Sequence, residues 1–396
     1  MPLKVTSRLI ELTGTPKGDF LFARSNQTLV GQGIALRLSA TGKNRISELA
    51  TKWREVCADA GISDSVKLPG SSLVAFSSIT FSENSKLESV LVVPQRLYVI
   101  RPEVSFVIEV EAEEQSEAIT STPTSFQIGK LNPTGFQDAV SKTISQINET
   151  DLKKVVLSRD LEMILPSQPD LSEPLARLRS RYPDCWTYKV EGVFGASPEL
   201  LLRAERGEVS ARVLAGTAGR GTDPDVDRAI ADGLSHSIKN NHEHAYAVQS
   251  MVSELEPFCE WVEADAQPFS LALPDLWHLA TDVRGKLKPA TSLLDVIAKL
   301  HPTAAVAGTP RDLAIALIEE LEPYDRGGYA GPVGWVSADG SGELAIALRG
   351  GIIETSKDQV VVRAIAGCGI VAESDPQAEL AETELKFRAV RYAFDL

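Results

Sequence analysis

The sequence predicts a large α/β domain of the α+β type, with extended antiparallel sheets flanked by helices. Strand-like runs follow one another through short turns, so hairpins outnumber strand–helix–strand units. Longer segments with helical spacing separate these strand groups. The chain has 396 residues and is 43% hydrophobic, enough for a large core. No internal repeat or low-complexity tract occurs, which argues against a solenoid or propeller.

The first third of the chain is strand-rich and irregular. Ser71–Phe81, Ser89–Ile100 and Ser105–Glu111 carry alternating apolar and β-branched residues and are predicted strands. The polar stretch Ala112–Thr124, with three Glu followed by Ser, Thr and Pro, is predicted to be a surface loop.

The middle of the chain alternates helices with strands. Phe136–Thr150 has helical spacing and leads into a predicted strand, Lys154–Ile164. Trp186–Phe194 is predicted as one further strand. A hairpin is expected at Glu205–Gly207, between the strands Glu199–Ala204 and Glu208–Ala215.

The last part of the chain begins with a long helical pattern, Asp223–Phe258, which we expect to break near Gly233. Three strands joined by turns precede the closing helix. The other predicted elements are the helices Leu293–Leu300, Arg311–Leu321 and Pro376–Phe394, and the strands Gly334–Ser337, Glu343–Arg349 and Val360–Ala366 with a turn at Ser356–Asp358.

Composition narrows the class of protein. The formal net charge of −14 argues against nucleic-acid binding and against adhesion to anionic lipid. The four cysteines form no CxxC pattern, and no segment approaches the ~20 apolar residues of a membrane span, so we expect a cytoplasmic protein. P-loop, GxGxxG and HExxH patterns are absent. Adjacent residues on a helix point about 100° apart, so His242, Glu243 and His244 are not expected to share a zinc.

Three residues of the closing helix form a single stripe. Glu379, Glu382 and Lys386 are separated by three and then four positions, which places them on one helix face. Mg²⁺ typically takes one or two protein carboxylates, and Glu243 on another helix could complete such a set. Solvated surface carboxylates and a plain Glu382–Lys386 ion pair remain the alternative interpretation.

Two residues could form a base and acid pair. A buried lysine such as Lys154, on a strand, can act as a neutral amine base, although it could also lie at the exposed start of that strand. Glu199 could be a desolvated general acid or an edge residue. Arg349 could bind a carboxylate through two of its guanidinium N–H groups, or it could form a structural ion pair. Gly367 and Gly369 allow close approach of a ligand to the backbone.

Eight ordered motifs resemble the chorismate-binding enzymes over residues ~130–394. They are KVVLSR (Lys154–Arg159), GASPELL (Gly195–Leu201), LAGTAGR (Leu214–Arg220), HEH (His242–His244), LWHLATDVRG (Leu276–Gly285), HPTAAVAGTP (His301–Pro310), EPYDRGGYAGPVG (Glu322–Gly334) and GCGIVAESDPQAELAETELK (Gly367–Lys386). The resemblance implies one chorismate-utilising domain over residues 1–396, with a variable part at 1–125, a motif-bearing region at 130–394, a cleft between sheet layers, and Mg²⁺ as cofactor.

Within that family, three positions resemble the isochorismate synthases. Lys154 stands where water-using members have Lys, Ala305 stands where salicylate synthases have Thr, and Tyr324 lies in an EPYDR motif similar to their EPFDR. The alternatives are a salicylate synthase, which eliminates pyruvate, an anthranilate or aminodeoxychorismate synthase large subunit, and a non-catalytic chorismate sensor. Asn240, where many relatives are acidic, and Ala304, where relatives have Pro, depart from the pattern.

The resemblance also implies residue roles. Lys154 would be the base and Glu199 the acid, while Glu243 and Glu382 would bind Mg²⁺ and Glu379 would act through a metal-bound water. The expected substrate-binding residues are Gly216, Thr217, His278, Ala305, Tyr329, Arg349, Gly367, Gly369 and Lys386. We expect a monomer without a glutamine amidotransferase subunit. Whether the product feeds menaquinone, a catechol siderophore or salicylate stays open.

Overall fold

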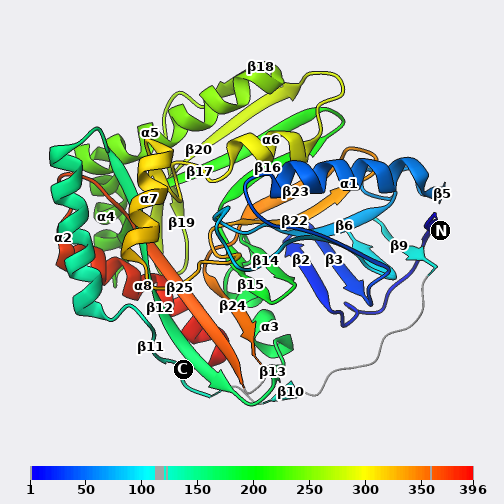
Figure 1. Ribbon diagram of the computed structural model, residues 1–396, viewed down its shortest axis with the longest axis horizontal. Helices are drawn as coiled ribbons and strands as arrows, with labels where there is room; N and C mark the ends of the chain where they lie inside the picture. The colour runs from blue at the N-terminus through cyan, green and yellow to red at the C-terminus, as the bar shows by residue number, and fades with distance from the viewer. Residues whose placement is uncertain (1, 112–119, 122–123, 357–358, 396) are drawn as a thin grey trace.

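Two large sheets form the centre of the protein and helices cover them, as a computed structural model shows (Figure 1). The model describes residues 2–111, 120–121, 124–356 and 359–395, without the side chains of Thr120, Ser121, Lys239 and Glu243. The predicted loop Ala112–Thr124 and the turn at Ser356–Asp358 lie largely outside these residues. The α+β class with extended, mainly antiparallel sheets is confirmed.

The first sheet joins both ends of the chain. Its order is β11-β12-β25-β24-β15-β14-β2-β3-β8-β9-β1-β5, with β21 beside β12, and its only parallel pair in the described residues is β1 with β5. The strands are β1 (Lys4–Leu9), β2 (Phe20–Arg24), β3 (Gln27–Gln32), β5 (Gly61–Asp64), β8 (Arg96–Ile100), β9 (Ser105–Val110), β11 (Gln127–Ile128), β12 (Lys154–Leu165), β14 (Trp186–Val190), β15 (Val193–Ser197), β21 (Gly308–Thr309), β24 (Gly350–Thr355) and β25 (Val360–Ile370).

The second sheet is antiparallel, in the order β18-β20-β17-β16-β23-β22-β6-β7-β4, with β19 beside β20. A short parallel pair, β10 (Thr120–Ser121) and β13 (Gln168–Pro169), stands apart. The strands of the second sheet are β4 (Leu36–Ala40), β6 (Val74–Ser78), β7 (Ser89–Val93), β16 (Leu200–Glu205), β17 (Glu208–Gly219), β18 (Cys259–Ala264), β19 (Phe269–Ala272), β20 (Leu276–Leu287), β22 (Pro332–Ser337) and β23 (Gly342–Ile346).

The helices divide between the sheets. α2, α3, α7 and α8 pack on the first sheet, and α1, α4, α5 and α6 pack on the second. α1 and α6 lie side by side, below β18 and toward the right in Figure 1. The helices are α1 (Arg45–Asp59), α2 (Pro133–Glu149), α3 (Ser172–Arg181), α4 (Pro224–His236), α5 (Ile238–Leu255), the 3-10 turn η1 (Glu256–Phe258), α6 (Leu293–Leu300), α7 (Arg311–Leu321) and α8 (Pro376–Phe394).

Several predicted elements need correction. The single strand predicted at Trp186–Phe194 is a hairpin, because Glu191 and Gly192 both adopt positive φ and reverse the chain. Pro94 and Gln95 likewise divide Ser89–Ile100 into β7 and β8. The long helix breaks at Ser237, which caps α5 through Asn240 N–H, and does not break at Gly233. The predicted strand that ends at Arg349 stops at Ile346.

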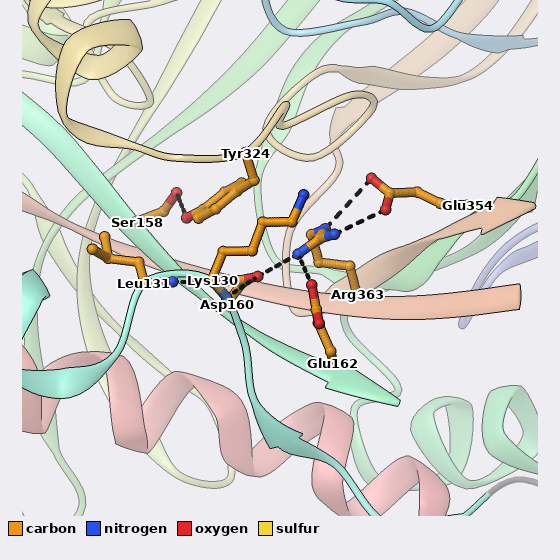
Figure 2. Close-up of polar contacts among 8 residues, drawn as sticks. All are labelled: Lys130, Leu131, Ser158, Asp160, Glu162, Tyr324, Glu354 and Arg363. Atoms are coloured by element: carbon orange, nitrogen blue, oxygen red, sulfur yellow. Dashed lines mark hydrogen bonds and ion pairs between the residues drawn. The ribbon is translucent and has the colours of Figure 1, made fainter. Parts of the chain in front are cut away.

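A buried ion cluster fastens the strands of the first sheet together (Figure 2). Arg363 on β25 contacts Asp160 and Glu162 on β12 and Glu354 on β24. Asp160 also accepts the backbone N–H groups of Lys130 and Leu131, at 3.1 and 3.0 Å. The cluster therefore ties the segment that leads into α2 to three strands.

Candidate active site

A cleft lies between the two sheets and is closed at one side by α8. Val156, Ile365 and Gly367 face it from β12 and β25 of the first sheet, and Thr217 and His278 face it from β17 and β20 of the second. Among the predicted site residues, those that line the cleft are Glu199, Gly216, Thr217, His278, Ala305, Tyr329, Arg349, Gly367, Gly369, Glu382 and Lys386.

Glu199 is a buried carboxyl group, 4% exposed, between β15 and β16. Burial raises its pKa to about 8, although the positive charges of Lys154, Arg349 and Lys386 partly oppose the rise. Glu199 is therefore largely protonated at neutral pH. It is not an exposed edge residue.

Lys154 is fully buried at the start of β12, where it pairs with Thr309 of β21. It is not at an exposed strand end, as the alternative interpretation proposed. Its charge acts on both Glu199 and His244, so its ammonium group lies within electrostatic range of these two side chains. Lys154 shares a strand face with Val156, which lines the cleft.

His278 connects the second sheet to Arg349. Its Nε2 accepts a hydrogen bond from the Arg349 guanidinium at 2.6 Å, and its Nδ1 lies 3.1 Å from Thr217 Oγ1 and 3.3 Å from the Gly216 oxygen. Burial, together with the charges of Arg349 and Lys386, holds the pKa of His278 well below its ordinary value. His278 is therefore a neutral ring.

Gly216 makes the bend that brings Thr217 to His278. Its φ is +83°, and the pairing of β17 with β20 shifts by one residue there. An added Cβ would lie 3.1 Å from the Cβ of Asn240, so Asn240 packs directly against this bend.

Arg349 and Lys386 place positive charge at the cleft wall. Arg349 follows β23 in a left-handed conformation, with φ +55°. Lys386 on α8 donates to the Gly367 oxygen at 2.8 Å and to Glu382 at 2.6 Å. Burial raises the pKa of Tyr329 to about 12, so its phenol keeps its proton and can donate it in a hydrogen bond.

The predicted metal carboxylates lie on α8. Glu379 is 2% exposed and accepts from Ser374 Oγ at 2.7 Å, while Glu382 lines the cleft and pairs with Lys386. Both raise the pKa of the Cys368 thiol, which is also raised by burial, so both lie near this residue. Two neighbouring carboxylates are hard oxygen donors that suit Mg²⁺.

The third predicted ligand, Glu243, lies on α5, but its side chain is outside the described part of the structure. Within the described residues no group of three His, Cys, Asp or Glu side chains forms a metal site. His244 is buried and neutral, since desolvation lowers its pKa to about 4, and it contacts the Ala215 oxygen and Thr281. His242 is exposed.

Arg326 and Cys368 line the cleft but were not among the predicted site residues. Arg326 is 3% exposed, is held by Glu322 at 2.6 Å, and donates to the oxygens of Val156 and Val306. Sequence reasoning used the EPYDR motif only to distinguish family members. Glu322 and Arg326 lie in the loop after α7, so no local periodicity pointed to their pairing.

Comparison with known proteins decides the family. Residues 100–395 match the family described as chorismate binding enzyme. The chain belongs to this family. No helix in the described part of the chain has the length and apolar character to cross a membrane.

Several named proteins are similar to this chorismate-binding enzyme. Isochorismate synthase DhbC of Bacillus subtilis is 30% identical over 387 residues, which cover 94% of this chain and 92% of DhbC. Isochorismate synthase EntC of Escherichia coli is 35% identical over 268 residues, which cover 66% of this chain and 68% of EntC. The structure of MenF, the menaquinone-specific isochorismate synthase from Escherichia coli, has a TM-score of 0.79 over 99% of this chain and 94% of MenF; at 22% identity it supports the fold alone.

Proposed function

We propose that this chorismate-binding enzyme is an isochorismate synthase. The observation that carries the proposal concerns two buried side chains. Glu199, a carboxyl that keeps its proton at neutral pH, lies within electrostatic range of Lys154. The similarity to DhbC and EntC, both isochorismate synthases, supports the same activity.

The proposed reaction adds water at C2 of the chorismate ring and expels the C4 hydroxyl, while the ring double bonds shift. Water is a weak nucleophile and hydroxide a poor leaving group, so both a base and an acid are needed. Lys154, as the proposed base, would take the proton from the attacking water. Glu199 would give its proton to the departing hydroxyl, which leaves as water, so that no net water is consumed. Each transfer would contribute roughly 10²–10⁴-fold.

The two carboxylates of the substrate need cationic and hydrogen-bonding partners. Arg349 and Lys386 would supply the charges, and the phenol of Tyr329 would donate a hydrogen bond. Thr217 and the backbone at Gly216, Gly367 and Gly369 would complete the cradle, because glycine lets a ligand approach the main chain closely. A Cβ at Gly367 would lie 2.7 Å from the Leu157 oxygen and 3.3 Å from the Tyr329 hydroxyl.

We propose that Mg²⁺ is held by Glu382 and Glu243, with Glu379 acting through water. When bound, the ion would offset the charge of the ring carboxylate. The closeness of two carboxylates to Cys368 on the cleft wall supports this donor set. Ser374 would keep Glu379 oriented through its 2.7 Å hydrogen bond.

A product assay tests the proposal. Purified enzyme is incubated with chorismate and Mg²⁺, without ammonia, and the products are separated chromatographically. Isochorismate alone supports it. Salicylate with pyruvate would instead identify a salicylate synthase, and no product without ammonia would point to an amino-transferring large subunit or a chorismate sensor.

We further propose that the enzyme acts as a cytoplasmic monomer without an amidotransferase subunit. Lys154 supports the absence of an amidotransferase subunit, since the resemblance assigns lysine at that position to water-using members. Size-exclusion chromatography with light scattering measures the assembly state, and glutamine-dependent anthranilate formation in a cell extract would contradict the proposal.

A further inference from the structure

A second cavity lies at the N-terminal end of α1, beside the turns that join α6 to α7. Its polar lining includes Lys43, Asn44, Arg45, Lys299, His301 and Arg311. Arg45 and His301 are both 5% exposed, so the cavity reaches side chains that are otherwise part of the interior. None of these residues belongs to the proposed catalytic set.

Arg45 is a buried cation that forms no direct ion pair in the described part of the chain, although the charge of Glu83 acts on it. Its guanidinium donates to the backbone oxygens of Thr80 and Phe81, at 2.9 and 3.1 Å, and its Nε has no hydrogen-bond partner there. Carbonyl oxygens satisfy N–H donors but do not neutralise the charge. A buried charge without a direct ion pair is costly, so Arg45 would gain from an anion bound beside it.

His301 adds unsatisfied polar atoms to the same cavity. Within the described residues, neither of its ring nitrogens makes a hydrogen bond of acceptable geometry. Burial and the charges of Arg45 and Arg311 hold its pKa well below the ordinary value. The Phe81 backbone, as a potential hydrogen-bond acceptor, raises the pKa in part. The ring is neutral and has one N–H, which can donate either to the Phe81 carbonyl or to a ligand in the cavity. Buried polar groups are normally hydrogen-bonded, so this one points to a missing partner.

The α1 terminus supplies further donors. The Asn44 side chain makes no capping hydrogen bond, so the first-turn N–H groups of this 15-residue helix lack the usual side-chain acceptor. The positive end of the helix dipole favours negative charge at the same place. The helix end therefore acts together with Arg45 and His301.

The charge of the lining is unusual for this protein. Four basic residues (Lys43, Arg45, Lys299 and Arg311) face three acidic ones (Glu83, Asp312 and Glu319), a balance of 4 − 3 = +1, whereas the whole chain carries −14. One of the acidic groups, Glu319, already accepts from Ser82 and Asn84. Arg311 is paired with Glu254, which leaves Lys43, Arg45 and Lys299 against the three acidic residues, a balance of 3 − 3 = 0 that is still less negative than the chain as a whole.

We propose that this cavity is a second ligand site that binds a small oxyanion of the phosphate class, either as free phosphate or as the phosphate group of a metabolite. Arg45, Lys43 and Lys299 neutralise the anion, and His301 and the first turn of α1 donate hydrogen bonds to it. His301 is the first residue of the loop that contains Ala305, and Ala305 lines the catalytic cleft. The proposed phosphate site therefore lies next to that cleft without sharing its residues.

Inorganic phosphate is the probe, and its binding to the full-length enzyme is measured by isothermal titration calorimetry in a phosphate-free buffer. We expect one phosphate per chain. His301→Phe keeps an aromatic ring for the edge contact with Phe81 but removes both nitrogens, and it should weaken binding about tenfold or more. Lys43→Gln and Lys299→Gln, both at exposed positions, should each weaken binding about two- to fivefold.

Lys4→Gln removes the same charge at the far edge of the first sheet and should bind phosphate like the wild type. Thermal unfolding in phosphate-free buffer verifies that each variant is folded. The proposal is overturned if no phosphate binds, or if affinity in His301→Phe and the two lysine variants equals that of Lys4→Gln. It is also overturned if Arg349→Gln abolishes binding, because phosphate would then occupy the catalytic cleft. If an organic phosphate binds more tightly than inorganic phosphate and loses affinity in the same variants, the natural ligand is the phosphate group of a metabolite. If the organic phosphate binds equally well or more weakly, the natural ligand is free phosphate.

Discussion

Arg349 donates a hydrogen bond to Nε2 of His278, with 2.6 Å between the two nitrogens. A guanidinium has no acceptor, so Nε2 must accept and the ring proton must sit on Nδ1, facing Gly216 and Thr217. The same ring therefore joins the bend in β17 to the arginine that we expect to bind substrate. This makes His278 a positioning residue for Arg349, in addition to its predicted role in substrate binding.

Replacing His278 by alanine should impair chorismate binding. Arg349 would lose the acceptor that orients it, and a hydrogen bond to a charged group is worth about 1.5–3 kcal/mol. We expect KM to rise about 10- to 100-fold while kcat changes less. His278→Gln, which keeps an acceptor, should recover part of the loss. Unchanged steady-state constants in His278→Ala would contradict this role.

Lys154→Ala should abolish turnover and leave binding measurable. The variant removes the proposed base, so kcat should fall roughly 10²–10⁴-fold. Chorismate affinity is followed by calorimetry, and Lys153→Ala, at the exposed neighbouring position, is the matched control. A rate like that of the wild type in Lys154→Ala would remove Lys154 as the base.

The rate should fall as the pH rises through about 8. Burial raises the pKa of Glu199 to about 8, and the acid must carry its proton to release the C4 hydroxyl, so the active form predominates below that pH. The profile of kcat/KM against pH should show a descending limb near this value. Glu199→Gln should be almost inactive at every pH. A wild-type rate that stays constant up to pH 9.5 would argue against Glu199 as the acid.

Much of the fold in the second half of the chain could be predicted, because its signals are local. The helices Leu293–Leu300, Arg311–Leu321 and Pro376–Phe394 occur with the predicted bounds, since apolar periodicity and terminal residues define them. α1 was missed, because nothing in the sequence distinguished its helical pattern from the irregular segments around it.

The cleft could be predicted only through the resemblance. His278 and Arg349 are 71 residues apart in the chain and meet through the pairing of β20 with β17 and the left-handed turn at Arg349, neither of which local patterns reveal. Burial likewise determines the protonation of Glu199, and burial depends on tertiary packing. The strand bounds around Arg349 were wrong for the same reason, because the turn follows long-range contacts.

Chorismate binding should depend strongly on Mg²⁺. The substrate is a dianion and the chain carries −14, so the overall field opposes its approach at low ionic strength. We expect affinity measured by calorimetry to fall at least tenfold in EDTA. Glu382→Gln should reduce Mg²⁺ affinity, measured directly without substrate, because it removes a proposed ligand. Equal chorismate binding with EDTA and with Mg²⁺ would contradict the proposed role of the acidic cluster.

The cluster in Figure 2 should control stability more than catalysis. Asp160 is fully buried and accepts from Arg363 and from two backbone N–H groups, so Asp160→Asn leaves part of a buried positive charge uncompensated. Breaking a buried ion pair costs about 3–5 kcal/mol, and we expect the lower end because Glu162 and Glu354 still hold Arg363.

Urea unfolding at neutral pH measures this loss, and Glu162→Gln provides the matched control. Glu162 contacts the same guanidinium, but its side chain is 19% exposed and it accepts no backbone N–H from the segment before α2 in the described contacts, so its loss should cost about 1 kcal/mol. The difference arises because water can partly replace Glu162, whereas no water reaches Arg363 at the position of Asp160. Equal destabilisation by the two variants would mean that the charge on Arg363 alone matters and that the anchoring of Lys130 and Leu131 contributes nothing.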